Sequence, residues 1–475
     1  DLFLSEQLLC LCTTSTLAQG VNFPAHLVIV KSTQYYAPGQ GYRELEERDV
    51  LQMIGRAGRP PFDTAATAVI MTTSENQRKW TACVHNDTPI ESTLLSQLKE
   101  HLVAEVVLGS ITSVPSALQW LQSTYLWQRV QRNPTHYGIP KGLNKNALLA
   151  ELRRICLHDI AALQEARLVR TVADAGDEER LVPTELGATL TRFYVAFDTI
   201  KCFCSVGAKA DMADLLWRLA SAKEFEDIHL RVSDKKPLNA LKKEGERTIR
   251  YPVTGRVATD RDKVYYLLQA ALSGHEFHDE WSLRQDTQCI FRCAARLARC
   301  LLCCVAAAPE PGETDQRRYT PVYNAAVLAK CIEQQMWDDS RLLFKQIDNI
   351  GVALSQRLFD AGVQTFEAAG AADCRVLDDA CGRRSPFGLQ LKAAIKKSVP
   401  SLALALRPRP DAPRQQLQID ADIAGGTAAT SASFLIVGTS ADRLLLFRRL
   451  AYTRGSGSLH GTLSVPYHER VLATA

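Results

Sequence analysis

The chain has 475 residues, enough for about three domains, and its 46% hydrophobic and 23% charged residues are the usual globular balance. This composition argues against a disordered, collagen-like or membrane-spanning chain. The net charge of +4 is too small to indicate a nucleic-acid ligand by itself. The 14 cysteines lack the spacing of a secreted disulfide scaffold, so we expect thiols in a reducing compartment. Because the chain begins with Asp1 rather than Met, we expect a fragment.

The first 80 residues alternate between short apolar runs and a helical segment. We predict buried strands at Leu8–Cys12, Leu27–Val30 and Ala66–Thr72, and a helix at Arg48–Gly55. Tyr35–Tyr42 contains one proline and two glycines, which predicts a turn or a hairpin tip. This order indicates an α/β domain that is short for a whole one.

After Trp80 the apolar spacing becomes helical. Helices followed by two short strands are the element order of a winged-helix domain. The expected helices are Ser92–Leu108, Ser116–Trp127, Asn146–Leu157 and Asp159–Ala166, and the expected wing strands are Leu168–Ala173 and Arg180–Pro183.

The rest of the chain is predicted to be helical before it ends in strands. Leu186–Cys202, Met212–Ala222 and Asp286–Ala308 are expected helices, and the last contains no Gly or Pro. The later elements are a helix–turn–helix at Asn349–Gly362, a linker rich in Pro, Ala, Gly and Gln at Pro400–Gly426, and a hairpin of Phe434–Val437 with Leu444–Phe447.

One glycine-rich stretch carries the most specific chemistry. Gln52-Met53-Ile54-Gly55-Arg56-Ala57-Gly58-Arg59 places two arginines three residues apart where a helix runs into a turn. Guanidinium groups are permanently charged and bind phosphate oxygens in a bidentate fork. An arginine that stabilises a transferring phosphoryl group is worth about 10³–10⁵ in rate, and Gln52 could orient the attacking water. The alternative is an ordinary glycine-rich turn with solvated arginines.

A second stretch, TTSTLAQGVNFPA at Thr13–Ala25, lies about thirty residues upstream. Together the two stretches resemble motifs V and VI of superfamily-two helicases, in the form found in the Ski-two-like helicases. Thr184–Ala308 resembles the helical Sec-sixty-three-type domain of this group, and Glu91–Ser110 resembles its winged helix. Ser385-Pro386-Phe387-Gly388 is most similar to the meiotic crossover helicases, which unwind DNA recombination intermediates.

The resemblance implies roles for individual residues around ATP. Gly20 and Asn22 correspond to the part of motif V that faces the nucleotide. Gln52, Arg56 and Arg59 correspond to the ATP-contacting residues of motif VI, with Arg59 as the arginine finger and Arg56 as its partner.

Two further segments correspond to nucleic-acid contacts in the family. Thr14 matches the motif V residue that contacts the nucleic-acid backbone. Tyr35–Tyr42 lies where archaeal relatives place a strand-separating hairpin, and the alternative for it is a plain surface loop.

The long predicted helix carries a basic stripe. Arg292, Arg296 and Arg299 are spaced i, i+4 and i+7, which at roughly 100° per residue places them within about 60° of each other. Such a stripe could bind single-stranded DNA through phosphate contacts and base stacking. The resemblance implies that this helix is the family's ratchet helix, which lines the DNA channel. The alternative is a solvated basic face. Next to the basic stripe, the same helix carries a stripe of four cysteines, Cys289, Cys293, Cys300 and Cys304. We expect these thiols to pack in the core rather than to bind zinc.

Asn349-Ile350-Gly351-Val352 resembles the turn of a helix-hairpin-helix, whose backbone N–H groups bind a DNA phosphate. Gly351 is therefore a candidate nucleic-acid contact, although Asn349 replaces one of the two usual glycines. The basic segment Arg383–Lys397 could add phosphate contacts. The alternative is a structural hairpin followed by a solvated basic helix.

The printed sequence contains no GxxxxGK[ST] loop and no DExH box. In the family these belong to the first RecA-like domain, so ATP and Mg²⁺ would be bound mainly there. We therefore expect half of an interdomain ATP site and no ATP hydrolysis by this chain alone.

These observations predict the C-terminal portion of an ATP-dependent 3′–5′ DNA helicase acting in meiotic crossover formation in the nucleus. Single-stranded and branched DNA, and recombination proteins, are the expected partners, with no membrane and no metal cluster. The alternatives are an RNA helicase of the spliceosomal type, or a non-enzymatic DNA-binding scaffold derived from a helicase.

The fold class is multidomain α/β plus α. The expected domains are 1–80, the C-terminal part of a second RecA-like domain; 81–183, a winged helix; 184–344, the helical ratchet domain; 345–400, a helix-hairpin-helix domain; 401–432, a linker; and 433–475, a truncated immunoglobulin-like β-sandwich.

Overall fold

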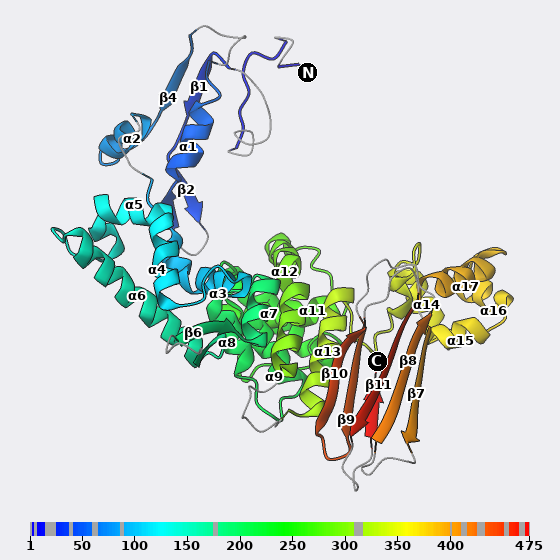
Figure 1. Ribbon diagram of the computed structural model, residues 1–475. Helices are drawn as coiled ribbons and strands as arrows, with labels where there is room; N and C mark the ends of the chain where they lie inside the picture. Colours follow the sequence, from blue (N-terminus) through cyan, green and yellow to red (C-terminus); the bar gives the residue numbers. More distant parts are fainter. Residues whose placement is uncertain are drawn as a thin grey trace. The chain divides into compact units, whose positions relative to one another are not determined.

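The computed structural model describes most of the chain and divides it into two compact units, Asp1–Thr93 and Leu94–Ala475 (Figure 1). Each unit is considered separately below. The described residues are 2–3, 7–14, 25–37, 41–58, 65–85, 90–173, 179–307, 317–399, 401–409, 416–424, 433–450, 456–464 and 471–474.

The first unit is built on a parallel strand pair. β1 (Leu27–Val30) pairs in parallel with β4 (Thr67–Ile70), which begins after α1 (Glu47–Ile54). β2 (Gln34–Ala37) and β3 (Gly41–Glu44) form an antiparallel hairpin between β1 and α1. Its small core joins Val50 of α1 to Trp80 and Cys83 of α2 (Gln77–Val84). The predicted α/β alternation and the hairpin are confirmed.

Two predictions for this unit are wrong. Leu8–Cys12 is not a buried strand, because these residues are exposed and have no regular secondary structure. β1 and β4 do form, but only Val30 among their residues is buried. Apolar residues predict burial only where a sheet is covered on both faces, and the described residues around this strand pair cover it incompletely.

The second unit begins with helices and a two-stranded wing. Its elements are α3 (Leu98–Leu108), α4 (Val114–Ser123), α5 (Tyr125–Arg132), α6 (Lys145–Glu165), β5 (Val169–Ala173) and β6 (Glu179–Pro183). The two helices expected at Asn146–Leu157 and Asp159–Ala166 are one continuous helix, α6. No Gly or Pro interrupts this stretch, and the Asn144 side chain caps its start by accepting a hydrogen bond from the Ala147 N–H.

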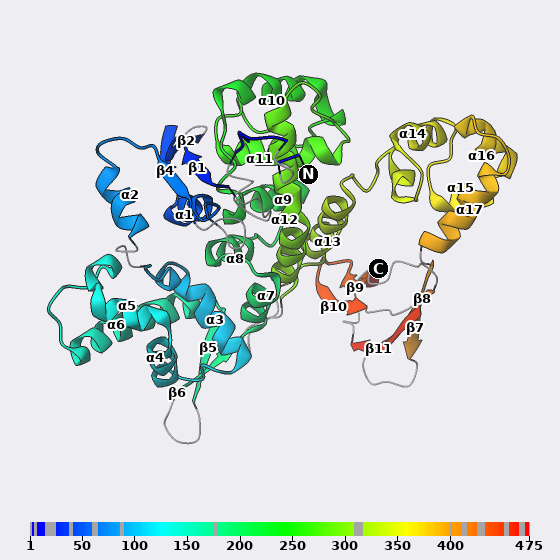
Figure 2. The ribbon, with the colours of Figure 1, turned by 90° about the horizontal axis from the view of Figure 1, so that it is seen from above.

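A helical body follows, in which a 26-residue helix is central. α12 (Trp281–Ala306) packs against several helices of this body, and α13 (Tyr319–Gln334) runs alongside it (Figure 2). Leu283, Ile290, Ala294, Leu297 and Leu301 of α12 are fully buried. The surrounding helices are α7 (Glu185–Phe193), α8 (Phe197–Cys204), α9 (Met212–Ala220), α10 (Lys235–Leu241), α11 (Asp260–Leu272) and α13 (Tyr319–Gln334).

The helix predicted at Leu186–Cys202 is broken into α7 and α8. The break lies at Tyr194, whose φ of 54° is left-handed. Glycine usually marks such a position, and its absence hid the break from the sequence. Two carboxylates bind the N-terminal end of α8. Glu100 accepts a hydrogen bond from the Phe197 N–H, and Glu224 accepts one from the Ala196 N–H.

A second helical cluster has its own apolar core. Its residues include Phe344, Leu358, Leu377 and Leu391, from η7 and three α-helices. The helices are η7 (Leu343–Gln346), α14 (Val352–Asp360), α15 (Phe366–Ala371), α16 (Cys374–Cys381) and α17 (Phe387–Ser398).

The chain ends in two three-stranded antiparallel sheets, ordered β11–β8–β7 and β10–β9–β12. The strands are β7 (Ser401–Arg409), β8 (Gln416–Ala424), β9 (Ser433–Thr439), β10 (Leu444–Leu450), β11 (Ser456–Ser464) and β12 (Val471–Thr474). The predicted hairpin is confirmed as β9 with β10, but the linker predicted at 401–432 is wrong for the two stretches that form β7 and β8. Composition suggested a linker, whereas alternating apolar residues and pairing in full register produce strands there.

The β9–β10 turn is attached to the start of α13. Asp442 Oδ1 accepts hydrogen bonds from the Thr320 N–H at 2.7 Å and the Thr320 hydroxyl at 2.6 Å. The Tyr319 N–H donates to the Asp442 carbonyl at 3.0 Å. A residue from the sheet region therefore caps a helix of the helical body. Within the described residues, no helix is both long and apolar enough to cross a membrane.

Candidate functional site

The arginine-containing turn follows directly from α1. Val50 is fully buried and fixes the helix, while Gln52 is exposed and Arg56 is half-buried. The Gly55 N–H donates to the Leu51 carbonyl at 2.9 Å, and the Arg56 N–H donates to the Met53 carbonyl at 3.2 Å. The helix thus tightens at its last turn, which holds the backbone of Arg56 against it.

The two predicted helicase motifs meet at this turn. Ala25, the last residue of the upstream motif, donates through its N–H to the Arg56 carbonyl at 3.2 Å and accepts from the Gly58 N–H at 3.3 Å. Gly58 has a φ of 72°, and a Cβ there would lie 3.0 Å from the Cβ of Ala66. Both observations favour glycine at this position, because a side chain there would be strained.

The structure describes only some of the remaining motif residues. Arg59, Gly20 and Asn22 lie outside the described residues. Thr14 is described and lies in an exposed stretch without regular secondary structure. The structure therefore describes the positions of Gln52, Arg56 and Thr14, and all of the motif assignments stay predictions.

The hairpin β2–β3 presents tyrosines to solvent. Tyr36 pairs with Tyr42, and Tyr35 pairs with Arg43, in the antiparallel register. Tyr42 is 75% exposed and Tyr35 is 47% exposed. Cross-strand partners share a face of the hairpin and successive residues alternate, so Tyr35 and Tyr42 lie on opposite faces. Each is a separate exposed ring on which a nucleic-acid base can stack.

The three arginines of α12 have different surroundings. Arg296 Nη1 donates to the carbonyl oxygens of Phe193 at 3.1 Å and Tyr194 at 2.8 Å, which end α7. Arg299 forms an exposed ion pair with Glu333 of α13. Arg292 is exposed and has no hydrogen bond or ion pair among the described residues. Of the three, Arg292 is the side chain that a nucleic acid can reach without displacing a partner.

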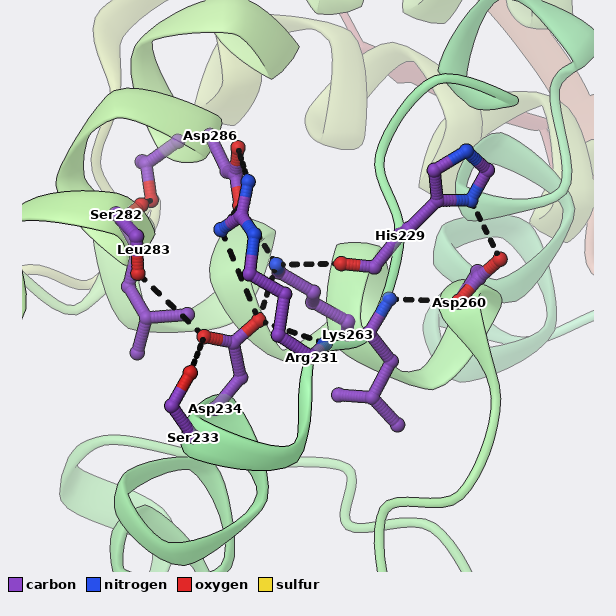
Figure 3. Close-up of polar contacts among 11 residues, drawn as sticks. His229, Arg231, Ser233, Asp234, Asp260, Lys263, Ser282, Leu283 and Asp286 are labelled. Atoms are coloured by element: carbon purple, nitrogen blue, oxygen red, sulfur yellow. Dashed lines mark hydrogen bonds and ion pairs between the residues drawn. The ribbon is translucent and has the colours of Figure 1, made fainter. Parts of the chain in front are cut away.

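A buried ionic cluster, which sequence reasoning missed, fixes the first half of α12 (Figure 3). Lys263 of α11 is fully buried, and its Nζ lies 2.5 Å from Asp234 Oδ2, 2.6 Å from Asp286 Oδ2 and 2.8 Å from the His229 carbonyl. All three ammonium hydrogens therefore have acceptors. Arg231 adds a second cation, 2.9 Å from Asp286 Oδ2.

The cluster positions the face that carries Arg292. Asp286 lies on α12, Lys263 on α11 and Asp234 in the short helix η5 (Val232–Asp234), so three segments are joined. No clear signal in the sequence indicated this burial, because Lys263 directly follows the charged run Asp260–Asp262 and looks like part of a solvated helix start.

The turn before α14 has one residue in the left-handed region, and its assignment as a helix-hairpin-helix turn stays a prediction. Asn349 adopts a φ of 67°, a left-handed conformation that asparagine tolerates better than most residues. Gly351 is the N-cap of α14 and makes no side-chain cap. Asn349 thus adopts a backbone conformation that glycine also adopts readily.

The cysteines of α12 lie against the helical body. Cys300 and Cys304 are buried, and Cys289 and Cys293 are partly buried. Burial raises the pKa of the Cys293 thiol, which keeps it neutral at physiological pH. This agrees with the core prediction for this stripe.

Comparison with known families follows the same division of the chain. The Sec63 Brl domain family matches residues 183–467, and a winged helix-turn-helix domain family matches residues 91–171. The predictions of a winged helix and a Sec-sixty-three-type region are confirmed.

Several relatives of this chain are named as ATP-dependent DNA helicases. The chain is 41% identical over 395 residues to the mouse protein named probable ATP-dependent DNA helicase HFM1, covering 83% of this chain and 27% of that relative. It is 32% identical over 489 residues to the rice ATP-dependent DNA helicase MER3 homolog, covering 100% of this chain and 39% of the relative. For MER3 of Saccharomyces cerevisiae the identity is 29% over 386 residues, with coverages of 78% and 31%.

The chain belongs to the Sec63 Brl domain family, within the Ski2-like helicases. More narrowly, it is homologous to the HFM1/MER3 ATP-dependent DNA helicases, of which it spans well under half the length. The predicted resemblance is confirmed at this level.

Proposed function

We propose that this chain is part of an ATP-dependent DNA helicase that acts in meiotic recombination. The observation that carries the proposal is the joint at Ala25, where hydrogen bonds to Arg56 and Gly58 connect two motifs whose sequences resemble helicase motifs V and VI. The names of the homologous proteins support the same activity. A nuclear location and 3′–5′ movement on DNA follow as parts of this proposal.

In this proposal the first unit is the C-terminal part of a second RecA-like domain. Its half-buried Arg56, held by the backbone of α1, suits a phosphate ligand because the guanidinium is permanently charged. Gln52, Arg56 and Arg59 would contact ATP, together with Gly20 and Asn22. ATP bound with Mg²⁺ supplies the phosphoryl transfer, and the arginines stabilise the negative charge that develops. The phosphate loop and the Mg²⁺ ligands would come from a first RecA-like domain.

Both units would contribute contacts to DNA. Arg292 on α12, the Gly351 turn and the tyrosines of the β2–β3 hairpin in the first unit are the proposed contacts, with Thr14 in motif V. Residues 345–400 would act as a helix-hairpin-helix domain and the terminal sheets as part of an immunoglobulin-like sandwich. Single-stranded and branched DNA are the proposed substrates.

The test uses a longer version of the protein that includes a phosphate-binding loop. Arg59→Ala should abolish ATP turnover and leave ATP-free DNA binding largely intact. The present chain alone should show no stimulated ATP turnover. If ATP turnover survived in Arg59→Ala, Arg59 would not be the arginine finger. If this chain alone hydrolysed ATP, it would not hold only half of the ATP site.

A further inference from the structure

Three thiols from two helices come together at the end of α8. Cys204 is the last residue of α8, and Cys300 and Cys304 lie one turn apart on α12. The Cys304 thiol is hydrogen-bonded to the thiols of both Cys204 and Cys300. About one hundred residues separate Cys204 from Cys304 in the sequence, so only the fold brings them together. We call these three residues the thiol cluster.

The packing of α8 on α12 sets the approach of Cys204 to Cys304. The two helices contact each other, and Ile200 and Phe203 of α8 are fully buried. Cys204 follows Ile200 by one helical turn and therefore lies on the same side of α8. Just before α8 begins, the Tyr194 carbonyl accepts a hydrogen bond from Arg296 of α12 at 2.8 Å. The two thiols are thus presented by packed helices rather than by a loop.

The members of the thiol cluster differ in their access to solvent. Cys204 is exposed, whereas Cys304 is only 8% exposed and Cys300 is fully buried. A small oxidant in solution therefore reaches Cys204 first. Cys304 lies behind it, in contact with the Cys204 sulfur and shielded from solvent.

The surroundings of Cys204 favour its thiolate, which is the form that reacts with oxidants. The hydrogen bond with Cys304 lowers the pKa of the Cys204 thiol, partial burial opposes this shift, and the positive charge of Arg167 adds to it. Hydrogen bonds with Cys204 and Cys300, and then burial, raise the pKa of Cys304 well above its usual value. Cys304 therefore keeps its proton, and Cys204 is the thiol that reacts first.

We infer that Cys204 and Cys304 form a reversible disulfide after a hydroperoxide oxidises Cys204. The Cys204 sulfur takes one oxygen from the peroxide and becomes a sulfenic acid, while the peroxide is reduced to water or an alcohol. The Cys304 sulfur then attacks the Cys204 sulfur. An S–S bond forms, the S–O bond breaks, and the hydroxyl leaves as water with the proton of Cys304. One peroxide thus oxidises two thiols, and a thiol reductant restores both.

Geometry favours this pair over the other pairs nearby. Cys300 and Cys304 are one turn apart on one helix, where Cβ atoms lie about 5–6 Å from each other, whereas a disulfide needs about 3.5–4.5 Å. Cys303 and Cys304 are neighbours in a regular helix, and such side chains do not face each other. The bridge therefore joins α8 to α12. A transient disulfide of this kind is compatible with a reducing compartment.

The test treats the whole 475-residue chain with hydrogen peroxide, blocks the remaining thiols with iodoacetamide under denaturing conditions, and maps tryptic peptides without reduction. Trypsin releases the two cysteines on peptides 202–209 and 300–317. Mass spectrometry should find these peptides joined, with a mass lower by two hydrogens than their sum, and fragmentation should locate the bond at Cys204 and Cys304. Dithiothreitol added before the blocking step should separate them.

Single substitutions identify the reacting pair. Cys204→Ser and Cys304→Ser should each abolish the joined peptides. Cys202→Ser is the matched control, because it removes a thiol from the same helix and the same peptide, and the joined peptides should persist. In Cys304→Ser the oxidised Cys204 has lost its partner, so its sulfenic acid should accumulate and be trapped by dimedone. Cys304→Ala repeats this measurement with an apolar side chain at the buried position.

Three results would overturn the inference. Joined peptides that persist in Cys304→Ser would show that another thiol of α12 is the partner. Peroxide-treated unaltered chain that carries a sulfenic acid at Cys204 but no joined peptides would exclude the bridge. Loss of the joined peptides in Cys202→Ser, with the far-ultraviolet circular dichroism of the folded chain retained, would assign the effect to the packing of α8 and not to Cys204.

Discussion

Lys263 Nζ lies 2.6 Å from Asp286 Oδ2, and this contact ties α11 to α12 in the interior of the helical body. Removing one partner of a buried ion pair leaves an uncompensated charge, which costs about 3–5 kcal/mol. Lys263→Met should therefore lower the free energy of unfolding of the helical body by an amount in that range. Urea unfolding followed by circular dichroism measures it.

The matched control for Lys263 is Lys236→Met, at an exposed position in α10. An exposed substitution of this kind changes stability by less than about 0.5 kcal/mol. If both variants unfolded at the same urea concentration as the unaltered chain, the cluster would not contribute to stability.

Substitutions of the three arginines of α12 should have different effects, because the arginines have different partners. Arg292→Ala should weaken binding of single-stranded DNA and leave the melting temperature unchanged, because Arg292 has no partner among the described residues. Arg296→Ala should lower stability by about 1–2 kcal/mol, because two carbonyls at the end of α7 lose their donor. Arg299→Ala should have little effect on stability, since exposed ion pairs contribute about 0–1 kcal/mol. Anisotropy and thermal melting of each variant check these outcomes, and a stability loss in Arg292→Ala would contradict the assignment.

Gly58→Ala should loosen the joint between the two motifs. The added methyl group meets Ala66 at 3.0 Å, and alanine at a φ of 72° is strained by about 1–2 kcal/mol. The buried thiol of Cys83 is a local reporter, because iodoacetamide reaches it only when the first unit opens. Its labelling should accelerate about tenfold. Gly207→Ala, where nothing lies within 4 Å, is the control and should leave the rate unchanged.

Two buried thiols should resist alkylation at pH 8. Burial raises the pKa of Cys331 to about 12 and that of Cys156 to about 11. Folding therefore favours the neutral thiol, and this contribution is complete below the unfolded pKa of about 8.5 and is lost as the pH rises towards the folded values. Peptide mapping after iodoacetamide treatment should show rapid labelling of the exposed Cys10 and Cys12 and none of Cys331. Equal labelling would show that the helical body opens readily.

The sequence predicted the order of elements better than their limits. Motif spacing placed the α1 turn, the wing and the long helix, because local patterns and short turns specify such features. It failed where distant contacts decide the outcome. The end of α7 at Tyr194 depends on Arg296, about one hundred residues away, and no local glycine reports it. The burial of Lys263 likewise depends on Asp234 and Asp286, which periodicity cannot bring together.

The candidate site was predictable to a similar extent. The short, specific motif singled out Gln52 and Arg56, and their roles at ATP stay predictions. The equal treatment of the three α12 arginines failed to anticipate that Arg296 and Arg299 have protein partners, since helical spacing reports direction and not neighbours.

The cap that Asp442 places on α13 gives the chain an unusual connectivity. The chain leaves the helical body after α13 and returns to the start of the same helix, where Thr320 is bonded to Asp442, 122 residues further along the chain. The second helical cluster and the strands β7 and β8 are thus a loop whose two ends are fastened to one helix. Closing a loop costs only about 0.6 kcal/mol more for each doubling of its length. Insertions or deletions between residues 343 and 432 should therefore be tolerated by the helical body, whereas a chain that stops before Asp442 leaves α13 uncapped.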